Sequence, residues 1–295
     1  MPTYPFMQVD AFTERPLAGN PCAIIFNADT LSDAQMLAIA KEMNLSETAF
    51  VLQSSVADVR ARYFTPAEEI PLAGHPTIAT MHALVETGQV SLHGDYTKIS
   101  LELQVGPISI ELYATAAGVR VVMSQKKPKF LATFSPDEAM PHFGLDTADC
   151  LPDVPLQIVS TGTPQLMIPV RSLDVLRRAR LNNATYPTFR SSAGFFSPHL
   201  FCLEGITEKG DTFARHFGVS PDVPEDPFTG SATGGMAAYL WHHGLIDKPT
   251  FTAEQGHWLN RPGQAQVEIV GPPDNIETVK VGGTAVTVIQ GELTI

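Results

Sequence analysis

Glu47 is the residue whose setting most directly points to chemistry. It lies in the stretch MNLSETAFVL and is the only charged side chain between Glu42 and Asp58. Its neighbours are typical of a protein core, where a carboxylate is costly unless it is paired or protonated. Partial burial favours the neutral carboxyl and raises its proton affinity, which suits a group that takes and returns a proton. A structural carboxyl satisfied by a nearby hydroxyl or arginine is the alternative interpretation.

Two uncharged segments are predicted to form buried helices. Neither 70–85 nor 227–241 contains Asp, Glu, Lys or Arg, and each is followed by a glycine suited to a helix end, Gly88 or Gly244. A helix that is apolar on every side must be surrounded by protein. Each segment is therefore expected to run through the centre of its part of the fold.

The starts of these two helices predict a binding site for an anion. Gly74 and Gly230 leave the first backbone N–H groups uncovered, and such groups attract negative charge. The polar residues His75, Thr229 and Ser231 stand at helix starts that are otherwise apolar. Tight strand-to-helix turns without a ligand are the alternative, but two copies favour a ligand site between two parts of the chain.

The positions of these features follow from an internal repeat. Three pairs of segments match in the same order, at offsets of 143 to 156 residues: AGNPCAII at 18–25 with TGTPQLMI at 161–168, ADVRARYF at 57–64 with GDTFARHF at 210–217, and PLAGHPTIATMHALVETG at 71–88 with PFTGSATGGMAAYLWHHG at 227–244. Self-similarity of this kind indicates repeated structure. Together with the length of 295 residues, it predicts two homologous halves.

Each half is expected to be rich in strands, with one or two helices. Alternating segments spaced like the strands of a curled sheet cover 4–12, 48–53, 59–64, 99–104, 108–113 and 119–123. Ser32 with Gln35 forms a capping box, which predicts a helix that Asn44 ends. The segment 126–155, rich in Pro and Asp, is predicted to connect the halves.

Composition excludes several classes of partner. The 31 acidic residues outnumber the 19 basic ones, giving a formal charge of −12, so nucleic acid and anionic membrane surfaces are not expected partners. No basic leader and no membrane-spanning apolar run is present, which predicts a cytoplasmic protein. Cys22, Cys150 and Cys202 are odd in number and far apart, which favours reduced, buried thiols.

Several motifs resemble the phenazine-biosynthesis PhzF-like family, which is related to diaminopimelate epimerase and proline racemase. The motifs span nearly the whole chain: DAFT at Asp10, AGNPCA at Ala18, NLSETAF at Asn44, RYFTPAEEIPLAGHPT at Arg62, EDPFTGSATG at Glu225, RPG at Arg261 and the closing VGGTAVTVIQGELTI. The resemblance implies an α+β fold of two pseudo-symmetric halves, each a β-barrel-like sheet around a central helix. It places the first half at 1–128 plus 284–295 and the second at 129–283, and implies a homodimer.

The resemblance also implies one acid–base group. Thiols of the epimerase relatives correspond to Ala73 and Thr229, neither of which exchanges protons near neutral pH, so two-thiol racemisation is excluded. In the PhzF-like pattern, the Glu of the SET motif, here Glu47, moves the proton. The counterpart region in the second half offers His199 but no carboxylate.

The remaining roles are carried over from the same resemblance. His75 is expected to contact the substrate and assist the proton, and Asp226 to hold an amino or hydroxyl group. Gly74, Thr229, Gly230 and Ser231 are expected to bind the substrate at the helix starts. Asn20, with Asp10 or Arg62, is expected to line or brace the cleft. Helix or core capping is the alternative role for His75 and Asp226.

Three functional hypotheses follow. The first is an isomerase that moves a proton within a small, carboxylate-bearing cyclic substrate of the dihydroanthranilate type. The second is an epimerase or racemase in which Glu47 works with His75 or Asp226, and the third is a protein that only binds a small anion. No cofactor or metal is expected, because nucleotide-binding glycine motifs and grouped metal ligands are absent. Pro76 removes one N–H at the first helix start, where family members often have Ala, and this favours a substrate other than the phenazine precursor.

Overall fold

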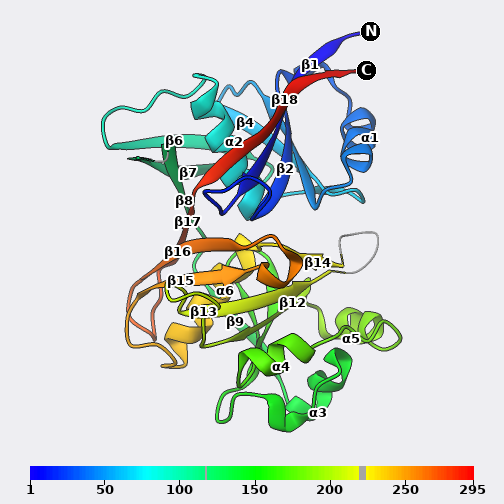
Figure 1. Ribbon diagram of the computed structural model, residues 1–295, viewed down its shortest axis with the longest axis vertical. Helices are drawn as coiled ribbons and strands as arrows, with labels where there is room; N and C mark the ends of the chain where they lie inside the picture. The colour runs from blue at the N-terminus through cyan, green and yellow to red at the C-terminus, as the bar shows by residue number, and fades with distance from the viewer. Residues whose placement is uncertain (117, 219–223) are drawn as a thin grey trace.

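The computed structural model describes residues 1–116, 118–218 and 224–295. It has an α+β fold of two pseudo-symmetric halves stacked end to end, and each half curls its strands around one helix (Figure 1). The two chain ends lie together at the tip of the first half, where Thr3 pairs with Thr294. The fold class predicted from the sequence is confirmed. None of the helices described is both long and apolar enough to span a bilayer.

The strands are β1 Thr3–Ala11, β2 Asn20–Ile25, β3 Glu47–Leu52, β4 Val59–Phe64, β5 Glu69–Ile70, β6 Tyr96–Leu103, β7 Gly106–Thr115, β8 Gly118–Ser124, β9 Lys129–Phe134, β10 Leu156–Ser160, β11 Pro164–Pro169, β12 Ser197–Cys202, β13 Thr212–Phe217, β14 Glu225–Asp226, β15 Thr250–Gln255, β16 Gly263–Val270, β17 Thr278–Gly283 and β18 Ala285–Thr294. The helices are α1 Asp33–Met43, α2 Gly74–Glu86, α3 Pro136–Ala139, α4 Leu173–Arg178, α5 Tyr186–Ala193 and α6 Gly230–His242. Short 3-10 turns are η1 Ala28–Thr30, η2 Met140–Phe143, η3 Thr147–Asp149 and η4 His257–Leu259.

The two halves repeat the same strand order. Neighbouring strands follow β18–β1–β2–β3–β4–β6–β7–β8 in the first half and β9–β10–β11–β12–β13–β15–β16–β17 in the second. The parallel pairs fall at matching places, β2–β3 and β4–β6 in one half and β11–β12 and β13–β15 in the other. The short strands β5 and β14 pair with β4 and β13. The repeat in the sequence is therefore a repeat of topology.

The central helices α2 and α6 explain the uncharged segments. Helix α2 packs against β1, β2, β3, β8 and β18, and α6 packs against β10, β11, β16 and β17. Most of their residues are buried, so a charge on almost any face would lie in the core. Gly88 and Gly244 follow the helix ends with φ of 71° and 67°, a conformation that glycine adopts without strain. Both helix ends were predicted correctly.

The two helices meet at their N-terminal ends, at the level where the halves join. A Cβ atom on Gly74 would lie 3.1 Å from the Cα of Gly230 and 3.1 Å from the backbone nitrogen of Ser231. Only glycine therefore allows this approach without a shift of the neighbouring helix. Two helix starts, each with partial positive charge, are thus brought together in one place.

Outside the central helices, one local prediction is confirmed and one is wrong. Helix α1 begins after Ser32, whose capping box with Gln35 is formed, and ends at Asn44 in the left-handed conformation. The segment 126–155 is not a simple connection, because it contains β9 on the edge of the second sheet and α3, whose Ala139 lies in the second core. Pro136 and Pro141 stand at the starts of α3 and η2, and Asp146 caps η3.

The chain passes between the halves twice, between β8 and β9 and between β17 and β18. Strand β18 returns to pair with β1, and β8 also pairs with β17 across the junction. These pairings support a first half of 1–128 plus 284–295 and a second of 129–283, which stays a prediction. The three cysteines are free and buried, as expected.

Candidate active site

A cavity of about 410 Å³ lies where the two halves meet. The first half contributes Glu47 and His75, and the second contributes Asp226. The facing starts of α2 and α6 form part of the lining, through Ala73 to His75 and Thr229 to Ser231. The structure therefore brings most of the expected site residues to one place.

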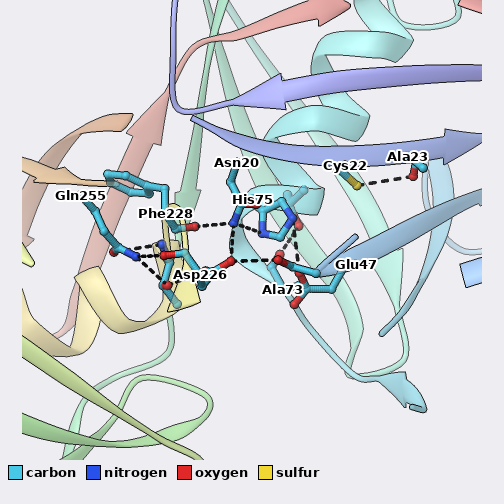
Figure 2. Close-up of polar contacts among 12 residues, drawn as sticks. Asn20, Cys22, Ala23, Glu47, Ala73, His75, Asp226, Phe228 and Gln255 are labelled. Carbon is cyan, nitrogen blue, oxygen red and sulfur yellow. Dashed lines mark hydrogen bonds and ion pairs between the residues drawn. The ribbon is translucent and has the colours of Figure 1, made fainter. Parts of the chain in front are cut away.

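Glu47 is the first residue of β3 and faces this cavity. Parallel pairing of β2 and β3 sets it opposite Cys22, and the start of the strand places its side chain at the edge of the core. The side chain is 18% exposed, so the carboxyl group is largely removed from water but remains within reach of a ligand. Its Oε2 lies 3.3 Å from Nε2 of His75 (Figure 2).

His75 is held as a neutral imidazole by its surroundings. It is 4% exposed, and desolvation lowers its pKa to about 3. Nδ2 of Asn20 lies 3.0 Å from Nδ1 of His75, and since an amide nitrogen only donates, Nδ1 accepts (Figure 2). The proton of the neutral ring is therefore on Nε2, the atom that faces Glu47. This contact is polar and close, without the alignment of a strong hydrogen bond.

Asn20 joins the two halves through its side-chain amide. Besides His75, its Nδ2 reaches Oδ1 of Asp226 and the backbone oxygen of Phe228, both at 2.8 Å. The opposite amide orientation would set an oxygen against two other oxygens, so the assignment is determined by these partners. Asn20 is fully buried and braces the cavity rather than lining it.

Asp226, on the short strand β14, accepts several hydrogen bonds at the cavity wall. Ser46 Oγ donates to Oδ1 at 3.0 Å, and Thr229 Oγ1 donates to Oδ2 at 2.5 Å. Burial nevertheless raises the pKa of Asp226 to about 6, because the three hydrogen bonds only partly offset desolvation. Glu47, His75, Asn20, Asp226 and Thr229 thus form one connected polar network across the halves.

The expected bracing residues support the site from behind. Oδ1 of Asp10 pairs with Arg261 at 2.6 Å, and Arg261 also donates to the backbone oxygens of Ala18 and Gly19, just before Asn20. Arg62 pairs with Glu69 at 2.6 Å, and Glu69 lines the cavity. Neither Asp10 nor Arg62 lines it.

The sequence interpretation missed many lining residues, among them the polar residues Ser46, Gln165, Ser197 and His216. The repeat offered a partial signal, because His216 matches Tyr63 and Gln165 matches Cys22 in the aligned segments. His199, which the sequence offered in the counterpart region of Glu47, lies two residues after Ser197 on β12. It contacts His216 and does not line the cavity. Ser231 is in the lining and accepts from Nε2 of Gln165 at 3.2 Å.

The residues at the expected thiol positions stand at the N-caps of α2 and α6, where Ala73 and Thr229 supply no thiol. Among the described residues, no group of three or more His, Cys, Asp or Glu is arranged to hold a metal ion. The cavity brings together the carboxyl group of Glu47 beside the neutral imidazole of His75, the carboxyl group of Asp226, and two helix starts.

Comparison with known proteins finds relatives along nearly the whole chain. Residues 9–291 match the family model PhzC-PhzF, described as phenazine biosynthesis-like protein. The trans-2,3-dihydro-3-hydroxyanthranilate isomerase of Pseudomonas fluorescens is 33% identical over 292 residues, covering 98% of each chain. The uncharacterized isomerase YfhB of Bacillus subtilis is 30% identical, covering 95% of each chain. A crystal structure of a PhzF-family phenazine biosynthesis protein from Bacillus anthracis superimposes with a TM-score of 0.89 at 33% identity, over the full length of both chains.

Proposed function

This chain belongs to the PhzC-PhzF family of phenazine biosynthesis-like proteins, and from that premise we propose that it is an isomerase that shifts a proton within a small, carboxylate-bearing cyclic substrate. Glu47 is the acid–base group in this proposal. The observation that carries it is the position of a partly buried carboxyl group in a cavity that also contains two facing helix starts. Relatives named as isomerases support the reaction class, and a dihydroanthranilate-like acid is the proposed substrate.

The facing helix starts supply the electrostatic part of the mechanism. The N–H groups at Gly74 and Gly230 bind the substrate carboxylate, with Thr229 and Ser231 beside it. When a proton leaves a carbon conjugated to that carboxylate, negative charge spreads onto its oxygens. Fixed N–H dipoles that already point at those oxygens stabilise this charge without reorganising.

Glu47 then takes the proton from one carbon and returns it to another on the same face. Nε2 of His75 is a close polar neighbour of Oε2 of Glu47. Because His75 is neutral, it does not hold Glu47 in a full ion pair that would suppress its basicity. Asp226 holds an amino or hydroxyl group of the substrate.

One form of the epimerase alternative fits the geometry poorly. Epimerisation needs two groups on opposite faces of one carbon, whereas Glu47 and His75 contact each other. Asp226, which lines the cavity from the second half, is the other partner that an epimerase could use with Glu47. The proposal requires no cofactor. A homodimeric state and a cytoplasmic location stay predictions.

Turnover in deuterated water tests the proposal. Incubation with a series of dihydroanthranilate-like acids is expected to move a double bond in one of them and to add deuterium, by exchange on Glu47, at the carbon that receives the proton. Inversion at a single carbon would replace the proposal with an epimerase. Binding without any exchange would reduce the protein to an anion-binding role.

A further inference from the structure

Helix α5 brings a second set of binding groups to the cavity, and the proposed mechanism does not use them. Tyr186 and Arg190 lie four residues apart on one face of this helix, and both line the cavity, as does Phe196 shortly after the helix end. We call these three residues the α5 subsite. Helix α5 lies on the flank of the second half, away from the central helix α6 (Figure 1). The α5 subsite is therefore separate from the two facing helix starts.

Arg190 is the only lysine or arginine among the described residues that line the cavity. Four acidic residues share this lining: Glu47, Glu68, Glu69 and Asp226. The guanidinium of Arg190 lies 5.4 Å from the ring centre of Phe196, and none of the ion pairs between described residues includes it. A full positive charge at the cavity wall is thus available to an anionic group of a ligand.

Tyr186 supplies a hydroxyl without a partner. The residue is fully buried, its ring packs near Phe143 and Phe195, and its hydroxyl has no hydrogen-bond partner among the described residues. A buried hydroxyl left unpaired is costly, so a phenylalanine would suit a purely structural position better. Burial raises the pKa of Tyr186, so the hydroxyl keeps its proton at neutral pH and can donate it. The charge of Arg190 opposes this rise, which indicates that the two polar groups are close.

The chemistry of the α5 subsite fits a carboxylate. A guanidinium binds a carboxylate through two parallel hydrogen bonds, and a phenol hydroxyl adds a third donor. A phosphate group carries nearly two negative charges at neutral pH, and one arginine beside four carboxyl groups would offset that charge poorly. Phe196 is 41% exposed and offers apolar surface to the carbon frame of a ligand.

We propose that Tyr186 and Arg190 bind a second carboxylate of the substrate, and that the substrate is therefore a cyclic dicarboxylic acid. One carboxylate lies at the helix starts, and the other lies at the α5 subsite. The inference rests on the proposed function for the first of these two placements. The cavity of about 410 Å³ has room for both groups, because sites that enclose drug-sized ligands measure about 300 to 1,000 Å³.

Calorimetry with benzoate and three benzenedicarboxylates tests the inference. Phthalate, isophthalate and terephthalate each add one carboxylate to benzoate, at three different spacings. The wild type is expected to bind at least one diacid about tenfold more tightly than benzoate, the scale of a charge-assisted hydrogen bond. Arg190→Gln is expected to remove this preference and to leave benzoate affinity unchanged, at about 0.15 M salt to screen distant charges.

Tyr186→Phe distinguishes a hydroxyl that binds the ligand from one that holds the fold. The variant should reduce the diacid preference about threefold and keep benzoate affinity. Without ligand it should unfold at the wild-type temperature, because the hydroxyl has no partner in the described protein to lose. A lower unfolding temperature together with weaker binding of all four acids would give the hydroxyl a structural role and remove it from the α5 subsite.

Arg177→Gln is the matched control. Arg177 lies on α4 in the same half, is exposed, and stands 5.6 Å from the ring centre of Trp258. The substitution removes the same charge and the same kind of ring contact outside the cavity lining, so the full diacid preference should remain.

Three results would overturn the inference: equal wild-type affinity for benzoate and every diacid, a preference that survives in Arg190→Gln, or an equal loss of benzoate and diacid affinity in that variant. Tighter binding of 3-phosphonobenzoate than of isophthalate would replace the second carboxylate with a phosphate. Turnover separates this inference from the proposed function. A diacid preference without turnover of any acid removes the proposed function alone, and turnover without a diacid preference removes this inference alone.

Discussion

The two halves present the same framework positions to one cavity and occupy them with different chemistry. Glu47 and His75 in the first half correspond to Ser197 and Ser231 in the second. A carboxyl group exchanges protons near neutral pH and a hydroxyl does not. In this account, duplication allows the first half to move the proton while both halves bind the substrate.

The framework itself differs little between the halves. Arg62 on β4 binds Glu69 on β5 through two hydrogen bonds of 2.8 and 2.6 Å, and Arg215 on β13 binds Glu225 on β14 through two of 2.8 and 2.7 Å. In both halves this pair holds the short strand that precedes the central helix. The halves therefore share the residue pairs that build the fold and differ in the residues that face the cavity.

The largest expected effect is on turnover in Glu47→Gln. The variant keeps the shape of the side chain and removes its ability to exchange a proton, so kcat should fall at least ~100-fold. Ligand affinity, measured by calorimetry, should stay within about tenfold, because the carboxylate of the substrate is bound elsewhere. Glu42→Gln, on the exposed surface of α1, is the control and should retain full activity. Retained turnover in Glu47→Gln would end the division of roles between the halves.

The two arginine–glutamate pairs should contribute differently to the unfolding free energy of the protein. Arg215 is 10% exposed and also donates to the backbone oxygens of Leu176 and Ala179, so Arg215→Ala leaves several buried acceptors unpaired. Its unfolding free energy should fall by about 3 to 5 kcal/mol. Arg62 is 16% exposed, and Arg62→Ala should cost only about 1 to 2 kcal/mol. Equal losses in chemical denaturation would show that the two halves depend equally on this pair.

Asp226 should make the stability of the protein depend on pH, and its position in the first half should not. Its counterpart in the first half is Ile70, which does not titrate. Because the folded pKa of Asp226 is raised to about 6, folding favours its protonated form. The stability that it contributes is full below the unfolded pKa and is lost as pH rises through about 6.

The measurement for Asp226 is a difference between two proteins. The unfolding free energy of the wild type minus that of Asp226→Asn should decrease from pH 4 to pH 6 and then level off. A difference that is constant, or that increases with pH, would show that burial does not raise this pKa.

The smallest expected effect concerns Pro76, which has Ala232 as its counterpart in α6. Pro76→Ala restores one backbone N–H at the start of α2. Affinity for benzoate, a plain carboxylate, should increase about fivefold, the scale of one added hydrogen bond. Unchanged affinity would show that the start of α2 contributes less to anion binding than the start of α6.

Local patterns predicted much of the fold. The capping box at Ser32, the glycines at Gly88 and Gly244, and the uncharged central segments each depend on residues close together in the sequence, and all are found in the structure. The segment 126–155 was misjudged because Pro and Asp occur both in linkers and at the starts of short helices. The capping box at Ser135 and Glu138 was the signal that was overlooked.

Long-range contacts were beyond such patterns. Arg261 reaches Asp10 across 251 residues of sequence, and the contact of Ser197 with His216 depends on the register of two strands. The sequence placed the counterpart of the SET motif in the segment 196–202 but pointed to His199, and strand pairing shows that Ser197 is the position that corresponds to Glu47. The roles of Asn20 and Asp226 came from family resemblance, since neither residue type is informative alone.

Transfer of label within the substrate tests the central claim most directly. A substrate deuterated at the carbon that loses its proton is converted in ordinary water, in a single turnover, and the product is analysed by mass spectrometry and NMR. If Glu47 takes and returns the proton, part of the deuterium appears at the carbon that receives it, and the remainder exchanges with water while it is on the carboxyl group. Label transfer that persists in Glu47→Gln would contradict the assignment of both steps to this carboxyl group.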